Sequence, residues 1–509
     1  MYKLLLFFCS ISIFSFAQEL KQSNQQQVIP GELPDPTVIK VGGVYYASGS
    51  SNNWGPYYPI YKSKDLKKWE FVSYVFDEMP KWTKDSYWAP ELYYENGTFF
   101  CYYTARRTDG ISCIGVASTR DITKGFKDHG VIIEWGNEAI DAYIYKENGT
   151  KYITWKAYGL TPEKPIQILG SALTDDGLKL KGKSFEIVTA EKDSWERGGI
   201  EGQSIIKNGE YLYMLYSGNA CCGSSCDYQV GVARAKSMKG PWEKNPANPI
   251  LKGNDTWKCP GHGTAVNTGR EWQYLYHAYP NYGFPYLGRS ALLSPFYWDR
   301  QTKWPYFNLQ AEQINPKRPK KDLIDEFDGN LKAWWRFDVS AYLPITEISN
   351  SQLKLKDQPI AEGDHIISAI VADPEHADFE IRTSIATSND VTSGLVYYAT
   401  NKKSLGFGIK SNKLTVWKLD EGKLEVISET TVEPAGPVYL KSTVKGANVF
   451  DFSFSTDNKT WTKMPMEHPF KANHLSWWSW GMKAGLFVKA DEDSKNKYGT
   501  FNRFSLKHL

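Results

Sequence analysis

The sequence predicts an all-β protein, a five-bladed β-propeller followed by a β-sandwich. Three observations lead to this fold class. Aromatic residues make up 15% of the 509 residues, and together with 41 Gly and 26 Pro they favour strands and tight turns over helices. One strand pattern recurs five times in the N-terminal part of the chain. A second, non-repeating series of alternating strands fills the remainder.

The length of the chain indicates its number of domains, and its net charge bears on the partners that it can bind. The chain exceeds the roughly 250–300 residues that one hydrophobic core supports, so we expect at least two domains. Its 60 Lys+Arg and 57 Asp+Glu leave a formal net charge of +3. This near balance gives no polyanion-binding face, and we expect no nucleic-acid partner.

Residues 1–17 have the layout of a secretory signal peptide. Lys3 precedes an apolar run from Leu4 to Phe16, and Ala17 supplies a small residue for cleavage. The run is shorter than the ~20 apolar residues of a spanning helix, and no later segment is long and apolar enough, so we expect no membrane span. The mature protein is therefore expected to be secreted or periplasmic.

An even number of cysteines follows the signal peptide: Cys101, Cys113, Cys221, Cys222, Cys226 and Cys259. In an exported chain this favours disulfides. We expect Cys101 and Cys113 to pair across a hairpin centred near residue 107. For the loop at 221–226 we expect bridging with Cys259 rather than a zinc site, which usually has two spaced Cys/His pairs. The connectivity of this group stays open.

The repeats begin with a turn glycine and an aromatic-rich strand, at Gly43, Gly97, Gly149, Gly209 and Gly269. A loop and a second strand follow each time, and several copies close with a third strand that contains Trp or Phe. Short antiparallel strands repeated every fifty to sixty residues are typical of propeller blades. The propeller is expected over residues 28–314.

Three repeats have an acid at the same position. Asp35, Asp141 and Glu201 each lie eight residues before the turn glycine of their repeat. Because the first strand of each blade lines the propeller axis, we expect the three side chains to meet in one pocket. The other repeats offer Glu91 and His262 at shorter offsets, so their side chains need not point the same way.

Each acid has a structural interpretation as well. Asp35 lies between two prolines, where an Asp is usually a turn residue. Asp141 and Glu201 adjoin apolar residues, where a carboxylate is costly unless it is paired or functional. The matched set of three therefore favours function.

Three carboxylates suit glycoside hydrolysis. One carboxylic acid protonates the leaving oxygen, and a second carboxylate acts on the other face of the sugar. A third raises the pKa of the acid by like-charge repulsion. Trp54, Trp88 and Trp155 lie near the expected channel and are candidates for binding the sugar, although blade packing is the competing interpretation for each.

Six motifs occur in a fixed order: Pro34-Asp35-Pro36, Ser63-Lys64-Asp65-Leu66, Trp88-Ala89-Pro90-Glu91, Ile140-Asp141, Glu201-Gly202 and Gly261-His262-Gly263. As a set, over about residues 28–310, they resemble the signature series of glycoside hydrolase family 43. The resemblance implies a five-bladed propeller and an inverting mechanism. It implies that Asp35 is the general base, that Glu201 is the general acid, and that Asp141 tunes the pKa of the acid and orients it.

The same resemblance implies two further roles. Arg289 resembles an arginine of the last blade that reaches the sugar pocket. His262 matches a histidine that in some members helps hold a structural calcium ion through waters; no cofactor is expected to be required. Glu91, Ala142 and Gln203 depart from the family's commoner residues, which leaves the substrate open.

The basic, Pro-interrupted segment 315–322 is the expected linker, and residues 323–509 are the expected β-sandwich. This part resembles the concanavalin-like C-terminal domain of family 43 β-xylosidases, in which a loop closes one side of the pocket. We expect Trp477, Trp478 and Trp480 in the seam between the domains rather than on a sugar-binding surface.

The predicted function is hydrolysis that releases pentose units, β-xylosyl or α-L-arabinofuranosyl, from the ends of a polysaccharide or oligosaccharide. One alternative is a retaining, fructosidase-like propeller, whose Asn-Asp-Pro-Asn type of motif is absent around Asp35. Another is a non-catalytic glycan-binding propeller. The sugar, exo or endo action and the oligomeric state stay open.

Overall fold

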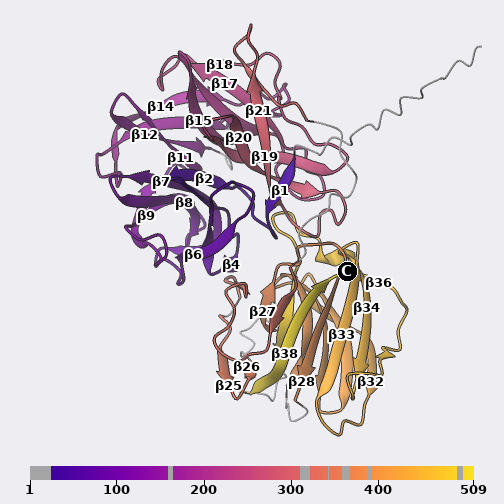
Figure 1. Cartoon of the computed structure of the whole chain (residues 1–509). Coiled ribbons are helices and arrows are strands. Elements are labelled where there is room, and N and C mark those ends of the chain that lie inside the picture. Colours follow the sequence, from indigo (N-terminus) through magenta and orange to yellow (C-terminus); the bar gives the residue numbers. More distant parts are fainter. Residues whose placement is uncertain are drawn as a thin grey trace, which may run out of the picture.

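The computed structural model describes residues 25–158, 164–309, 321–341, 343–357, 367–386, 391–489 and 497–509. These residues form two β domains, one after the other along the chain (Figure 1). The predicted signal peptide and residues 315–320 of the predicted linker lie outside this part. No helix within the described ranges is long and apolar enough to cross a bilayer.

Five antiparallel sheets of four or five strands form the propeller. The first contains β2 (Thr37–Val41), β3 (Val44–Ser48), β5 (Tyr57–Ser63) and β6 (Glu70–Phe76). The second contains β7 (Thr83–Glu95), β8 (Thr98–Arg107), β9 (Ser112–Thr119) and β10 (Lys127–Ile133). The third contains β11 (Ala139–Glu147), β12 (Thr150–Ala157), β13 (Gln167–Leu173) and β14 (Leu180–Thr189).

The last two blades close the ring. The fourth contains β15 (Ile200–Asn208), β16 (Tyr211–Gly218), β17 (Gln229–Ala235) and β18 (Glu243–Lys244). The fifth contains β19 (Trp257–Asn267), β20 (Trp272–Pro280) and β21 (Ser290–Trp298), with β22 (Pro305–Tyr306) and the early strand β1 (Gln26–Ile29) both paired to β21. The first strands β2, β7, β11, β15 and β19 each contact the next, and β19 contacts β2. These five strands therefore surround the axis, as predicted.

The turn glycines explain why the repeat is visible in the sequence. Gly43, Gly97, Gly149, Gly209 and Gly269 all have positive φ, between 61° and 90°, in the hairpin that joins the first two strands of a blade. Side chains other than Asn or Asp rarely adopt this conformation, so the glycine recurs wherever the hairpin does.

The second domain is a two-sheet sandwich, as predicted. One sheet runs in the order β25 (Thr346–Ser349), β26 (Gln352–Lys356), β38 (Tyr498–His508), β28 (Phe379–Ile385), β33 (Val438–Lys445), β34 (Val449–Ser455) and β35 (Thr462–Lys463). In this sheet β23 (Leu323–Asp325) pairs with β38 and β36 (Phe470–Lys471) with β34. The other sheet runs β27 (Ser368–Ala372), β37 (Lys483–Lys489), β29 (Thr392–Thr400), β30 (Lys403–Lys410), β31 (Lys413–Asp420) and β32 (Lys423–Thr431). Buried side chains of both sheets, such as Phe407 and Phe452, form one core.

The two domains are joined by backbone pairing and by buried charges. β4 (Trp54–Gly55) of the propeller pairs with β24 (Phe337–Asp338), which follows the linker. Lys483 of the sandwich lies 2.5 Å from Glu32 of the propeller and also contacts Asp373, and its side chain is only 3% exposed.

The predicted Cys101–Cys113 bridge is wrong: both cysteines are free and buried. The β8–β9 hairpin pairs Cys101 with Ala117 and Cys113 with Ala105, so its centre lies near residue 109 instead of 107. This register separates the two cysteines by four residues along the strands, or about 13 Å, whereas bridged Cα atoms lie within about 7 Å.

The second cysteine group forms two disulfides. Cys226 is bonded to Cys259, which confirms the expected bridging with Cys259, and Cys221 is bonded to its neighbour Cys222. The Cys221–Cys222 bridge lies within the loop between β16 and β17, and the Cys226–Cys259 bridge ties this loop to β19; Cys221, Cys226 and Cys259 pack with Tyr228 and Tyr279.

Candidate active site

Irregular backbone near the start of the innermost strands directs the three acids. Asp35, just before β2, has φ 52°, and Asp141 in β11 has φ 60°. The pairing of β11 with β12 shifts register directly after Ile140, and that of β15 with β16 directly after Glu201. Bulges and positive φ are costly for ordinary residues and re-aim side chains, which is why they concentrate at functional sites.

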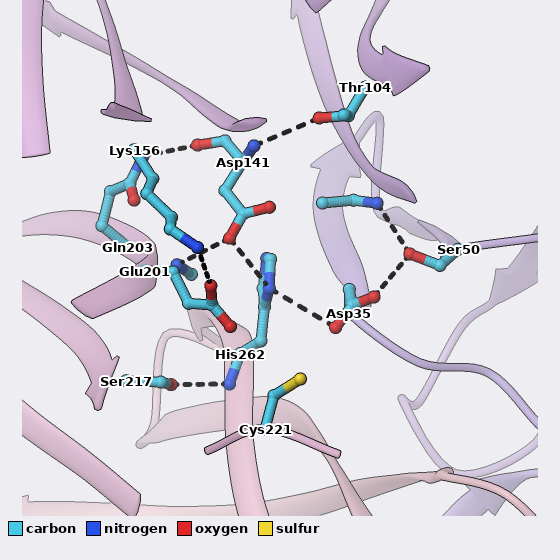
Figure 2. A network of polar contacts seen from close by, with 12 residues as sticks. Asp35, Ser50, Thr104, Asp141, Lys156, Glu201, Gln203, Ser217, Cys221 and His262 are labelled. Carbon is cyan, nitrogen blue, oxygen red and sulfur yellow. Dashed lines mark hydrogen bonds and ion pairs between the residues drawn. The ribbon is translucent and has the colours of Figure 1, made fainter. Parts of the chain in front are cut away.

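Acids from the first, third and fourth blades meet around His262 of the fifth blade (Figure 2). The Nδ1 atom of His262 lies 3.4 Å from Oδ1 of Asp35 and 3.6 Å from Oδ2 of Asp141. The backbone N–H of Gly202, next to Glu201, donates to Oδ2 of Asp141 at 3.0 Å. The matching eight-residue offsets therefore place the three acids in one network, as the sequence predicted.

Asp35 is held as an ionised carboxylate. Ser50 donates to its Oδ2 at 2.5 Å, and Arg289 donates to its Oδ1 at 3.1 Å. Burial alone would raise the pKa of Asp35, but Arg289 and His262 outweigh burial and hold it well below its usual range. An acid with so low a pKa stays available as a proton acceptor at any physiological pH.

His277 supports the backbone of Asp35. The backbone N–H of Asp35 donates to Nδ1 of His277 at 3.0 Å, so that nitrogen carries no proton. Burial and the nearby Arg289 lower the pKa of His277 to about 4, which keeps the ring neutral. The ring of Tyr228 stacks on that of His277, with centroids 5.7 Å apart.

Glu201 lies in a chain of charges that the sequence analysis did not anticipate. Nζ of Lys156 lies 2.7 Å from Oε2 of Glu201 and 3.2 Å from Oε1 of Glu138. Tyr228 donates to the other carboxylate oxygen of Glu201 at 3.0 Å. Burial raises the pKa of Glu201, but the ammonium of Lys156 outweighs it, and the net pKa is lowered.

Asp141 has the opposite shift. Burial, together with the charges of Glu201 and Asp35, raises its pKa to about 7, although His262 and Lys156 act against this rise. These opposite shifts favour the protonated form of Asp141 and the ionised form of Glu201 near neutral pH. The expected like-charge repulsion between the acids is present, but it raises the pKa of Asp141. The pKa of Glu201 is lowered by Lys156.

Two of the three tryptophans proposed to bind sugar are not available for it. Trp54 is 2% exposed and packs between the domains, against Tyr398 and Trp480. Trp155 is fully buried between blades, against Trp135. Both are corrected to packing residues, because the side chains of β4 and β12 at these positions face hydrophobic cores.

Trp88 stays a candidate for contact with a sugar, whereas Arg289 is only 3% exposed and its guanidinium binds Asp35 and the carbonyl of Ser479. Trp88 is half-buried and directly precedes Ala89, whose N–H donates to the same Ser50 hydroxyl that holds Asp35. The Nε atom of Arg289 is buried and has no hydrogen-bond partner among the described residues. The network does not include Glu91, whose carboxylate accepts from Thr37 at 2.7 Å.

One wall of the site contains the adjacent-residue disulfide. Figure 2 draws the sulfur of Cys221 directed toward Asp35 and His262. On the outer side of this loop, Gly223 lies against Trp478 of the sandwich domain, which is 50% exposed. Trp480 is in the predicted seam, where its indole N–H donates to the carbonyl of Ala399.

A metal ion gains no support from this geometry. Calcium prefers carboxylate and carbonyl oxygens. No group of three or more His, Cys, Asp or Glu within the described ranges is arranged to hold a metal. His262 directs Nδ1 to two carboxylates, so we derive no step through a calcium ion.

Sequence reasoning missed four polar residues of the network: Ser50, Lys156, Tyr228 and His277. Only Lys156 gave a signal, because a lysine within the apolar strand Ile153-Thr154-Trp155-Lys156-Ala157 implies a buried partner. The others lie at ordinary strand or loop positions, and only the tertiary structure brings them to the acids.

Comparisons with known proteins agree with this fold. The family described as Glycosyl hydrolases family 43 matches residues 25–305, and the Beta xylosidase C-terminal Concanavalin A-like domain matches residues 325–507. A xylan 1,3-beta-xylosidase from a Vibrio species is 24% identical over 495 residues, 86% of this chain and 89% of its own. A non-reducing end alpha-L-arabinofuranosidase from Bacteroides ovatus is 25% identical over 67% of this chain and 66% of its own.

Solved structures share the whole two-domain fold. A xylan beta-1,4-xylosidase from Bacillus halodurans has a TM-score of 0.79 at 21% identity, covering 95% of this chain and 100% of that one. A family 43 protein from Bacillus licheniformis has a TM-score of 0.78 at 21% identity, covering 96% and 100%.

Proposed function

Because the chain belongs to glycosyl hydrolase family 43, we propose that it is an inverting glycosidase that removes terminal pentose units, β-xylosyl or α-L-arabinofuranosyl, from a polysaccharide or oligosaccharide. The observation that carries the proposal is the convergence of Asp35, Asp141 and Glu201 on one network. The pentose is suggested by relatives whose names specify xylosidases and arabinofuranosidases.

The assignment of the general base rests on the charges around Asp35. A base must be ionised at the working pH, and Arg289 ensures this by lowering the pKa of Asp35. In the proposed step, Asp35 takes a proton from water while the water oxygen bonds to the anomeric carbon. The bond from that carbon to the leaving oxygen breaks on the opposite face, and configuration inverts.

The general acid is Glu201, which gives its proton to the leaving oxygen. In the resting arrangement Lys156 keeps Glu201 ionised, and the neighbouring Asp141 holds the proton. For catalysis the proton passes to Glu201, and Lys156 turns to Glu138, its other partner at 3.2 Å. The network thus gives Lys156 an alternative ion pair while Glu201 is neutral.

We also propose export of the mature enzyme. The proposal rests on the layout of residues 1–17 and on the two disulfides, which are typical of oxidising compartments. Cleavage after Ala17, determined by N-terminal sequencing of the exported protein, is the expected result.

Two variants test the roles of the acids. Glu201→Gln should lower kcat/KM on natural oligosaccharides by about 10²–10⁴, because the leaving oxygen then departs without a proton. Its loss should be much smaller on aryl pentosides whose phenolate leaves readily. Asp35→Asn should impair both substrates alike, and the exposed Glu186→Gln is the matched control.

The product anomer tests the stereochemistry. Proton NMR during the first minutes of hydrolysis should show the anomer opposite to that of the substrate. A retained anomer would contradict the inverting mechanism and favour the fructosidase-like alternative. Tight glycan binding without turnover would favour the non-catalytic alternative.

A further inference from the structure

The sandwich domain carries a polar cavity on the outer face of its larger sheet. The cavity has a volume of about 180 Å³ and lies over three neighbouring strands, β28, β33 and β38. In Figure 1 these strands lie side by side in the second domain, away from the propeller blades. None of its lining residues belongs to the acid network.

Residues directly opposite one another on β28, β33 and β38 form the floor of this cavity in two rows. Arg382 of β28 pairs with Lys441 of β33 on one side and with Ser505 of β38 on the other. In the next row, Ser384 pairs with Tyr439 and with Arg503 in the same way. Because alternate residues of a strand share a face, these side chains project from the same side of the sheet.

Positive charge exceeds negative charge around the cavity. Arg382 is paired with Glu380 at 2.5 Å, and Arg503 with Glu326 at 3.1 Å. Lys441 and Lys507 make no ion pair with any described residue. The chain as a whole is almost balanced in charge, so this local surplus of positive charge stands out. Burial and the nearby Arg382 lower the pKa of Lys441, which shows that these two cations lie close together.

An aromatic ring and hydroxyl groups complete the cavity. The ring of Trp461 lies over this face, with Nζ of Lys441 at 4.2 Å and the guanidinium carbon of Arg382 at 5.3 Å from its centroid. Ser384, Tyr439 and Ser505 add hydroxyl groups to the lining. Indole and hydroxyls suit a sugar ring, whereas the cations suit an anionic substituent.

We propose that this cavity binds a hexuronate unit of a glycan, with the carboxylate on Arg382 and Lys507 and the sugar ring against Trp461. A carboxylate can accept two parallel N–H bonds from the fork of a guanidinium. The cavity would attach the enzyme to acidic side groups of a polysaccharide while the propeller acts elsewhere on it. Binding here requires no turnover, so it is independent of the proposed function.

Calorimetric or NMR titration of the full protein tests the site. Methyl glucuronide should bind at least about tenfold more tightly than methyl glucoside at low salt, and the difference should shrink as salt is raised. Lys507→Gln and the double variant Arg382→Gln/Lys507→Gln should lose that preference. Their kcat/KM on an aryl pentoside should stay that of the wild type.

A matched control lies on the opposite sheet. Lys413→Gln/Lys418→Gln removes two cations of β31, each paired with a glutamate, and should leave glucuronide binding unchanged. Equal affinity for the two glycosides, or an unchanged preference in the Lys507 variant, would overturn the proposal. So would tighter binding of a sugar sulfate, or loss of glucuronide binding in Asp35→Asn, which would move the site to the propeller.

Discussion

At the scale of single residues, the site depends on how one proton is shared. Asp35 is kept ionised by Arg289, whereas Asp141 has a pKa of about 7. Lys156 contacts Glu201 directly and lowers its pKa, whereas a negative charge on Asp141 raises it. Glu201 therefore has two opposing neighbours: the ammonium of Lys156 favours its ionised form, and Asp141 favours its protonated form whenever Asp141 is itself ionised.

Replacing Lys156 should shift the pH profile. In the proposed mechanism activity requires a proton on Glu201 or Asp141, so wild-type kcat/KM should fall as the pH rises past about 7. Lys156→Met removes the cation that favours ionisation, which raises the pKa of the pair. We expect the descending limb to move to higher pH by about 1–3 units. Rates on an aryl pentoside between pH 5 and 10 measure this.

Two further variants separate charge from packing. Lys156→Arg keeps the cation and should keep the limb near its wild-type position. Lys146→Met removes a half-exposed lysine paired with Glu95 and should leave the profile unchanged. A limb that does not move in Lys156→Met would show that this ion pair does not control the acid.

At the scale of strands and loops, the sequence predicts what local geometry determines. The turn glycines identify the blades because their positive φ is a local requirement. The equal eight-residue offsets of the three acids predict their convergence for the same reason, because each offset is measured from the turn glycine of the same blade. The Cys101–Cys113 pairing fails because it required the register of a hairpin, and an error of two residues in its centre is enough to separate the sulfurs.

The disulfide within the β16–β17 loop and the disulfide that ties this loop to β19 should differ in their effects on stability and activity. Cys226 and Cys259 are 33 residues apart, so the double serine variant should lose about 3–4 kcal/mol of unfolding free energy. Cys221 and Cys222 are adjacent and close no chain loop, but Cys221 belongs to the wall beside Tyr228, which holds Glu201. Their double serine variant should therefore lose kcat/KM with little change in stability.

Denaturant unfolding and kinetics on one preparation of each variant compare the two effects. The two double variants control for each other, because each removes one disulfide, and each disulfide has at least one cysteine in the β16–β17 loop. The opposite pattern would contradict these roles: a loss of stability in the Cys221/Cys222 variant and a loss of activity alone in the Cys226/Cys259 variant.

At the scale of the whole molecule, the site is completed by contacts between domains. Arg289, which holds Asp35, also donates to the backbone carbonyl of Ser479 in the sandwich at 3.1 Å. The Ser479 hydroxyl in turn donates to Asn52 of the propeller. Sequence reasoning anticipated a seam at Trp480 but placed Trp54 in the sugar pocket. The seam joins segments more than 400 residues apart, and no local pattern encodes that pairing.

Lys483 is a buried charged residue of this seam. Its ammonium contacts Glu32 and Asp373, and the Glu32 side chain is only 4% exposed. Lys483→Met should lower the unfolding free energy by about 3–5 kcal/mol at pH 8, because an uncompensated carboxylate remains buried. The exposed Lys445→Met, which breaks a surface pair with Asp378, should cost no more than about 1 kcal/mol.

The Lys483→Met deficit should also depend on pH. Burial raises the pKa of Glu32 in the folded protein, and Lys483 opposes that rise. Without the lysine the folded pKa rises further above the unfolded value, so the folded state binds an additional proton and loses stability as the pH increases. Urea unfolding at pH 5 and pH 8 should give the smaller deficit at pH 5. An equal deficit at both values would mean that the lysine acts through packing and not through its charge on Glu32.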